Sequence, residues 1–231
     1  MASRPDDRPP PGETIVASRF STDEYEPGLR LEAARAYTRP FFELAPASTS
    51  EDGIDAVSTS WLLHDLVLNQ TRYGVMRMER PNRRQLTTRH AFVTVWLILE
   101  GRQGGIIADS PFRARAGELH LFDGAPAMRL VSARPHVLSA HVPYGAIGFD
   151  PSRHPPHLAI PADGAMRHVV AATLRALHAR APTIRAGEAE DLSRMVCSLL
   201  RSAFGLDSSR ASDPSPIHEG RALAMRAFLD G

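Results

Sequence analysis

The stretch "HAFVTVWLILE" at residues 90–100 decides the fold class of this chain. A β-strand places alternate side chains on opposite faces, and both alternating sets are largely apolar here. One set holds Phe92, Thr94, Trp96 and Ile98, and the other holds Val93, Val95, Leu97 and Leu99. A strand that is apolar on both faces is central, packed between the inside of a barrel or sandwich and a layer that covers the outside.

Further short runs surround this strand. The "EGRQGG" at residues 100–105 is expected to supply the positive-φ residues of a hairpin turn. Runs separated by Gly, Pro, Asn and Asp are typical of antiparallel strands. Between residues 55 and 145 we expect them at 58–68, 73–80, 104–109, 117–123, 127–132 and 136–143.

Helical patterns flank the β-rich region. Ser21 and Glu24 form a possible capping box before one short helix. Later, apolar residues recur at helical spacing over 164–179, with Asp163 as N-cap, and over 187–204. Two consecutive amphipathic helices form an antiparallel hairpin.

The predicted fold is therefore mainly β with α: a β-barrel followed by an antiparallel helical hairpin. The expected organisation is a disordered lead-in at 1–20, the short helix and barrel at 21–160, the hairpin at 161–205, a linker at 206–220 and a last helical segment at 221–231.

Composition excludes several classes of protein. The 231 residues include no lysine, and the net charge is +1, so the chain lacks the basic face of a self-sufficient nucleic-acid binder. The single cysteine, Cys197, excludes a disulfide framework and is expected to be a buried structural thiol. The N-terminus lacks the apolar core of a signal peptide, and no run is long enough for a membrane span. We expect a cytoplasmic protein with no membrane contact.

The sequence favours binding over catalysis. The β-rich middle could be a cupin barrel, whose metal sites take ligands from a His-x-His pair with a Glu on one strand and a further His on a later strand. Here "RHAFVTVWLILEG" offers only His90, and His120 and His141 stand alone on other strands. No serine lies in a Gly-x-Ser-x-Gly turn, and "EGRQGG" lacks the lysine and following helix of a phosphate loop. We therefore expect no enzyme activity, metal or cofactor.

A closed barrel offers a site for a small organic molecule. The expected ligand-binding residues are Tyr73, Arg77, Trp96, His120 and His141, because pockets combine apolar walls with a few polar groups. The alternative is that Trp96 is ordinary core and that the histidines are partly exposed strand positions. Register decides between the two, since a slip of one residue reverses every face.

The second helix of the hairpin offers a dimerisation face. Its apolar residues are spread widely enough to contact both the barrel and a partner, and self-complementary two-fold contacts are the commonest kind in dimers. The expected interface residues are Leu192, Met195, Val196, Leu199 and Ala203. The alternative is that this stripe only covers the barrel.

The order of these features resembles a known family. "WLILEGRQGGIIADSPFRARAGELHLFDGAPAM" and the following "LSAHVPYGAIGFDPSRHPPHLAIPADGAMRHVVAATLRALHA" are similar to the cupin-like sensor domain of the AraC/XylS bacterial transcription regulators. Gly117, Glu118, Asp123 and the Val142-Pro143 pair are the most specific points. One departure is Tyr144, where such regulators often have arginine.

The resemblance, over about residues 20–205, implies a jelly-roll barrel that binds an effector and a hairpin that forms a homodimer. Such regulators continue into a helix-turn-helix DNA-binding domain, and "RALAMRAFLDG" at 221–231 is similar to the start of its first helix. DNA contact would then belong to a domain that is largely missing. Two alternatives stay open: a metal-dependent cupin enzyme, and a stand-alone dimerising partner that inhibits full-length regulators.

Overall fold

Two long strands organise the molecule. The computed structural model describes residues 12–39, 42–46, 54–80, 91–160 and 162–206. Its strands are β1 (Ala17–Ser21), β2 (Glu43–Pro46), β3 (Ala56–Leu63), β4 (Leu66–Tyr73), β5 (Met76–Arg80), β6 (Phe92–Ile107), β7 (Ser110–Arg115), β8 (Leu119–Asp123), β9 (Met128–Pro143) and β10 (His157–Ile160). Its helices are η1 (Thr22–Glu24), η2 (Pro27–Leu29), α1 (Arg30–Thr38), α2 (Tyr144–Ile147), α3 (Ala165–Arg180), η5 (Ala181–Thr183) and α4 (Ala186–Ala203).

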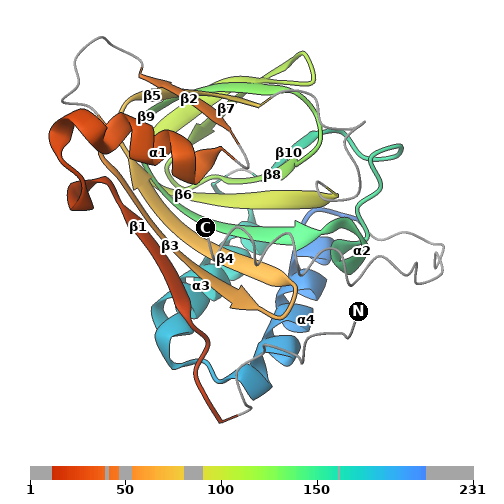
Figure 1. The fold of residues 1–231 in the computed structure, drawn as a ribbon. Coiled ribbons are helices and arrows are strands. Elements are labelled where there is room, and N and C mark those ends of the chain that lie inside the picture. Colours follow the sequence, from red (N-terminus) through yellow and green to blue (C-terminus); the bar gives the residue numbers. More distant parts are fainter. Residues whose placement is uncertain (1–11, 40–41, 47–53, 81–90, 161, 207–231) are drawn as a thin grey trace, which may run out of the picture.

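The strands β6 and β9 pair along most of their length and each takes part in two layers (Figure 1). The first half of β6 and the second half of β9 lie in a main sheet of order β1-β3-β4-β9-β6-β8-β10. Their other halves pair with β7 and β5, and β2 extends β5. All these pairings are antiparallel, as the sequence predicts.

The "EGRQGG" segment is a corner within β6, so the prediction of a hairpin turn there was wrong. The register shifts twice between Ile98 and Arg102, where Gly101 has a φ of +70°. A Cβ on Gly105 would lie 1.9 Å from the carbonyl oxygen of Arg129. The glycines therefore serve a β-bulge and a close backbone approach, and the β6–β7 turn falls at Ala108, which has a φ of +45°.

Two other strand boundaries differ from those predicted from the sequence. The expected strand at 58–68 is split into β3 and β4 by a turn at His64, whose φ is +57°. The runs at 127–132 and 136–143 form one strand, β9.

The expected lead-in ends before residue 20. The segment Ala17–Ser21 forms β1, which pairs with β3 and buries Phe20. Ile15 is buried as well, and its N–H donates to the carbonyl oxygen of Ile184 at 2.9 Å. These two apolar residues give the segment enough burial to be ordered. Residues 1–11 of the expected lead-in lie outside the described residues.

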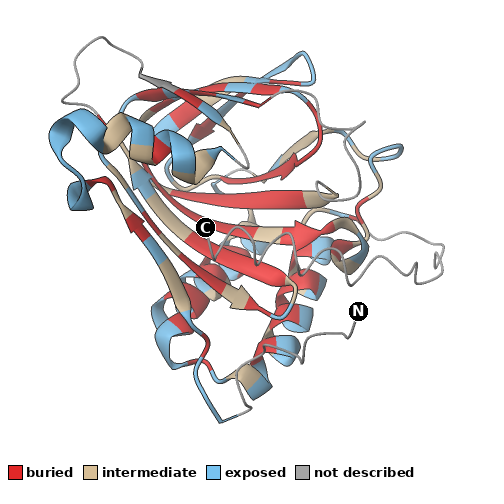
Figure 2. Ribbon diagram, viewed as in Figure 1, coloured by how far each residue is buried: buried red, intermediate tan, exposed pale blue. Residues whose placement is uncertain are grey.

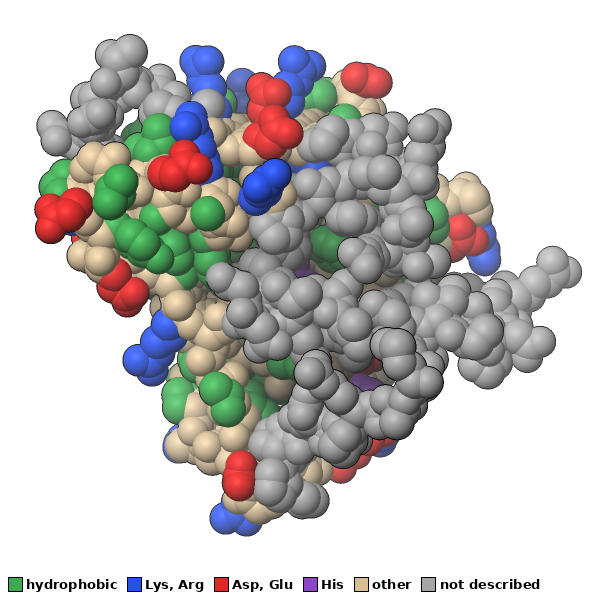
Figure 3. All heavy atoms as spheres, viewed as in Figure 1, with side chains coloured by type: hydrophobic (Ala, Val, Ile, Leu, Met, Phe, Trp, Pro, Cys, Tyr) green, Lys and Arg blue, Asp and Glu red, His purple; other side chains and the backbone are tan. Residues whose placement is uncertain are grey.

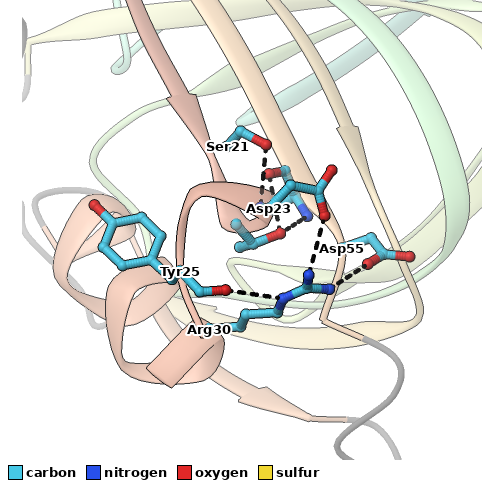
Figure 4. Close-up of polar contacts among 7 residues, drawn as sticks. Ser21, Asp23, Tyr25, Arg30 and Asp55 are labelled. Atoms are coloured by element: carbon cyan, nitrogen blue, oxygen red, sulfur yellow. Dashed lines mark hydrogen bonds and ion pairs between the residues drawn. The ribbon is translucent and has the colours of Figure 1, made fainter. Parts of the chain in front are cut away.

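The segment after β1 is fixed to the start of β3 (Figure 4). Ser21 Oγ accepts a hydrogen bond from the N–H of Asp23 and caps only the short η1. Arg30 forms ion pairs with Asp23 at 3.4 Å and Asp55 at 3.6 Å. These contacts hold α1 beside the main sheet, where Ala34 is fully buried.

The helical hairpin covers one face of the main sheet, as Figures 1 and 2 show. The bounds of α3 and α4 agree with the sequence to within one residue, although Gly164 occupies the N-cap position expected for Asp163. Gly205, with a φ of +64°, follows the end of α4. Within the described residues, no helix is long and apolar enough to cross a membrane.

Candidate functional site

The face of the main sheet turned away from α3 and α4, called the inner face below, carries a row of polar side chains. Directly opposite residues of an antiparallel pair lie on the same face. Trp96 on β6 pairs with Ser139 on β9 and with His120 on β8. Followed from β1 to β8, the row is Ser18, Ser60, Asn69, Ser139, Trp96 and His120.

Four of the five expected ligand-binding residues lie on the inner face. Trp96 and His120 belong to the row just described, and both are buried. His141 lies in the neighbouring row, opposite Thr94. Tyr73 lies toward the end of β4, where its hydroxyl donates to Gln103 Oε1 at 2.6 Å. Burial raises the pKa of the Tyr73 hydroxyl, so this group donates and is not ionised at neutral pH.

The fifth, Arg77, does not line the inner face, and the prediction for it was wrong. Burial on β5 alternates, with Met76, Met78 and Arg80 buried and Arg77 exposed. The buried arginine is therefore Arg80, whose guanidinium donates to the carbonyl oxygens of Asp123 at 2.8 Å and Pro126 at 3.2 Å. The error arises from the two-residue period of a strand, which the sequence alone does not place in register.

His120 belongs to a chain of three polar groups. Glu118 Oε2 lies 3.1 Å from His120 Nε2, and His120 Nδ1 lies 3.0 Å from His157 Nε2. Because a carboxylate only accepts, His120 carries its proton on Nε2 and accepts at Nδ1 from His157. The two imidazole planes differ by 6°, and His157 also stacks on Phe122 with ring centroids 4.8 Å apart. The rings therefore have a fixed orientation.

Burial keeps the histidines of this face neutral near pH 7. It lowers the pKa of His120, and it lowers that of His157 to about 4. His141 also has its pKa lowered to about 4, by burial first and by the positive charge of Arg80 second. Its Nδ1 lies 3.1 Å from Thr94 Oγ1. The inner face thus presents neutral hydrogen-bonding groups beside an aromatic ring.

Two buried polar atoms near this face have no hydrogen-bond partner in the described part of the chain: Ser60 Oγ and Gln103 Nε2. Their neighbours are well paired. Ser58 Oγ, for example, accepts from the Tyr37 hydroxyl at 2.9 Å and donates to Asn69 Oδ1 at 3.2 Å. The unpaired atoms stand out because buried polar groups normally have partners.

Tyr144, the departure from the regulator pattern, has its own contact in this structure. Its hydroxyl donates to Asp123 Oδ1, and that oxygen also accepts from the N–H of Ala125 at 2.9 Å. Asp123 is fully buried at the end of β8. The tyrosine therefore ties the end of β9 to the end of β8.

The expected dimerisation residues on α4 differ in exposure. Val196 is fully buried in the core of its own chain and offers no surface to a partner. Leu192, Leu199 and Ala203 are partly buried, and 49% of Met195 is exposed. These four are left as the candidate face.

A surface groove of about 610 Å³ lies along α4 and shares Met195 with the candidate dimerisation face. The β3–β4 turn contributes His64 and Asp65, and α4 contributes Met195, Cys197 and Arg201 among others. Burial raises the pKa of the Cys197 thiol to about 11, so the thiol is protonated at neutral pH. The groove carries charges of both signs and none of the inner-face residues.

Metal ligands were also sought among the described residues. No group of three or more His, Cys, Asp or Glu side chains in them is placed to hold a metal ion. His90 lies outside the described residues, as do residues 207–231 with most of the expected linker and the whole of the last helical segment.

Several residues of the inner face were not predicted. His157 follows two prolines and was taken as part of an extended stretch, yet it pairs with β8 opposite Phe122. Ser60 lies inside the predicted strand at 58–68, where only the register shows which way it faces, and Asn69 lies one residue beyond the end of that prediction. The alternation of Met76, Met78 and Arg80 was a signal that could have identified Arg80.

Comparisons with known proteins identify the fold. No protein-family model and no curated protein matches the sequence. The structure is similar to the crystal structure of the AraC-like transcriptional activator CuxR, with a TM-score of 0.72 and 16% identity over 91% of this chain and 79% of that chain. The cupin-like fold class, a jelly-roll barrel with a helical hairpin, is thereby confirmed.

Weaker similarities cover about half of this chain. Ectoine synthase from P. lautus aligns with a TM-score of 0.31 and 14% identity, over 51% of this chain and 86% of that chain. The cupin domain of an XRE family transcriptional regulator from Enterobacter cloacae aligns with a TM-score of 0.28 and 10% identity, over 45% of this chain and 97% of that chain.

Proposed function

We propose that this chain is the effector-binding and dimerisation region of a cytoplasmic AraC/XylS-type transcription regulator. The inner face binds a small organic molecule with an apolar or aromatic part. DNA contact belongs to a helix-turn-helix domain that the described residues do not include. The proposal requires no catalytic residue and no cofactor.

One observation carries this proposal: Ser60 Oγ and Gln103 Nε2 are buried without a hydrogen-bond partner among the described residues, near a face that also holds Trp96. Leaving a buried donor or acceptor unpaired costs about 1–3 kcal/mol. A ligand that pairs with such atoms recovers part of this cost, and the indole ring offers it a flat apolar wall. The fold shared with an AraC-like activator supports the same proposal.

A path from the inner face to the helices supports a regulatory role. The side chain of Asn69 faces inward, while its carbonyl oxygen lies 3.0 Å from His178 Nε2 on α3. A ligand that moves Asn69 therefore acts on α3 directly. For such a ligand to regulate, it must bind two arrangements of the dimer with different affinities.

The ligand site is tested with the two tryptophans. A thermal-shift screen of small organic molecules first identifies a ligand. We expect Trp96→Phe to weaken its binding by up to about tenfold, because the smaller ring keeps only part of the indole's contact and an aromatic contact is worth about 0.5–1.5 kcal/mol. Trp61→Phe is the matched control, since Trp61 is equally buried but packs on the helix side. Equal affinities for both variants would contradict the proposed site.

The dimer is tested on α4. We expect Leu199→Glu and Met195→Glu to convert dimers into monomers in sedimentation analysis, because a charge in an apolar interface lacks a partner. Val57→Glu, an equal change at an exposed residue of β3, serves as the control. Folded variants that stay dimeric would contradict this interface.

Metal analysis separates the proposal from a metal-dependent cupin enzyme. We expect the purified chain to bind an identified effector after treatment with a chelator. Stoichiometric iron, manganese or nickel that is lost in His120→Ala and His141→Ala variants would contradict the proposal and favour the enzyme.

A further inference from the structure

A second surface, independent of the inner face, lies on the outside of the smaller layer formed by β2, β5, β7 and the adjoining halves of β6 and β9. The exposed residues of these strands share one face because of their register: Arg102 opposes Arg115, Gly104 opposes Arg113 and Val131, and Ile106 opposes Arg129. Arg77, opposite Val131, completes the set. This outer arginine face consists of Arg77, Arg102, Arg113, Arg115 and Arg129.

None of these five guanidiniums has an ion-pair partner within the described part of the chain. By contrast, Arg194 on α4 pairs with Glu190 at 2.9 Å and Asp191 at 3.0 Å. Arg102 and Arg115 are directly opposite each other, and like charges in that position destabilise a sheet. The Arg102–Arg115 pair therefore carries an electrostatic cost that no ion pair among the described residues offsets.

The centre of the face is apolar. Ile106 is 39% exposed and Val131 is 49% exposed, and Gly104 between them adds no side chain. Figure 3 shows basic side chains spread along this end of the molecule, with acidic ones beside them. Arginines around an exposed aliphatic centre are the composition that protein interfaces favour.

The details favour an acidic protein over a nucleic acid. The exposed positions of these described strands carry no aromatic ring on which a base could stack. Two carboxylates lie on the same face. Glu79 on β5 is directly opposite Arg129 on β9, and Glu43 on β2 is directly opposite Glu79. They would repel a continuous phosphate backbone, whereas a protein partner can place its own groups around them.

We propose that the outer arginine face binds an acidic protein segment that also carries aliphatic side chains. Its carboxylates pair with the guanidiniums, and its aliphatic groups cover Ile106 and Val131. A surface of this kind would let a regulator contact another protein while its inner face holds a ligand. Substitutions on the outer arginine face can then remove protein binding without removing ligand binding, and the reverse.

The experiment uses fluorescence anisotropy with the whole chain and three probes: a peptide of alternating Glu and Leu, a peptide of alternating Glu and Ser, and random-sequence duplex DNA. The charge variant combines Arg102→Gln, Arg113→Gln and Arg115→Gln. The control variant combines Arg19→Gln, Arg153→Gln and Arg175→Gln, which removes the same charge from exposed positions elsewhere. Thermal melts confirm that both variants are folded.

We expect the Glu-Leu peptide to bind the wild-type chain more tightly than the other two probes. The charge variant should weaken this binding about tenfold or more, and the control variant less than about twofold. Val131→Ser should weaken binding of the Glu-Leu peptide and leave the Glu-Ser peptide unchanged.

Three results would overturn the proposal. The wild-type chain fails to bind the Glu-Leu peptide, or the control variant loses as much affinity as the charge variant. The third result is tighter binding of duplex DNA than of the peptide, lost in the charge variant. It would show that the face binds a phosphate backbone.

Discussion

The two faces of the main sheet bury different chemistry although the same strands supply both. Under α3 and α4 the sheet presents a block of nearly inaccessible apolar side chains: Val93, Val95, Leu97, Leu119, Leu121, Leu138, Ala140 and Val142. The inner face mixes Trp96 with serine, asparagine, threonine and histidine. The helix-facing side therefore serves stability, while the inner face keeps polar groups that a stability-optimised core would lack.

The largest expected effect is on the helix-facing side. Leu97→Ala should lower the free energy of unfolding by about 2–5 kcal/mol, because Leu97 is fully buried under the helices and its loss leaves a cavity. Urea denaturation measures this change. A cost below about 1 kcal/mol would mean that the helices do not seal this face.

The next effect is a pH dependence that belongs to the inner face. The folded pKa of His141 and His157 is about 4, below the ordinary value of 6.5, so the unfolded chain binds more protons between these limits. Stability should be constant above about pH 7 and fall as the pH decreases toward 4. For His141, the more deeply buried, the loss is about 2 kcal/mol by pH 5.

Substitutions assign this pH dependence to its source. His141→Gln should reduce the slope of the unfolding free energy against pH between 7 and 5. His64→Gln is the control, since His64 is exposed on the β3–β4 turn. If the control flattens the slope as much as His141→Gln, the inner face is not the source.

A smaller effect compares two buried serines. Ser193 Oγ donates to Asp65 at 2.8 Å on the helix side, whereas Ser60 Oγ has no hydrogen-bond partner in the described ranges of the chain. Ser193→Ala should cost about 1 kcal/mol, and Ser60→Ala should leave stability unchanged or increase it. Thermal melts of the two variants measure the difference. A larger loss for Ser60→Ala would show that its hydroxyl already has a structural role.

The sequence predicted the apolar face better than the polar one. Two apolar sets on residues 92–99 were enough to make this strand central and to require covering helices, and α3 and α4 cover it. The inner row depends on registers between strands far apart in the sequence, as between Asn69 and Ser139 or Ser139 and Trp96. A single sequence does not contain these registers. Arg77 was therefore predicted to line the barrel, whereas the buried arginine of β5 is Arg80.

The hairpin turn predicted at residues 100–105 was wrong because of its glycines. In "EGRQGG" a turn and a bulge demand the same backbone freedom, and only the long pairing of β6 with β9 shows that the strand continues. His157 was missed for another reason: its partner His120 lies on β8, before β9 in the chain, and nothing local indicates that the proline-rich stretch returns to that strand.

The most direct test of a ligand site on the inner face is the fluorescence of each tryptophan alone. Trp61→Phe leaves Trp96 as the only tryptophan, and Trp96→Phe leaves Trp61. Titration with an effector found by the thermal-shift screen should change the emission of Trp96 in the first variant and leave that of Trp61 nearly constant in the second. A change in Trp61 emission with none in that of Trp96 would place the ligand on the helix side and contradict the account.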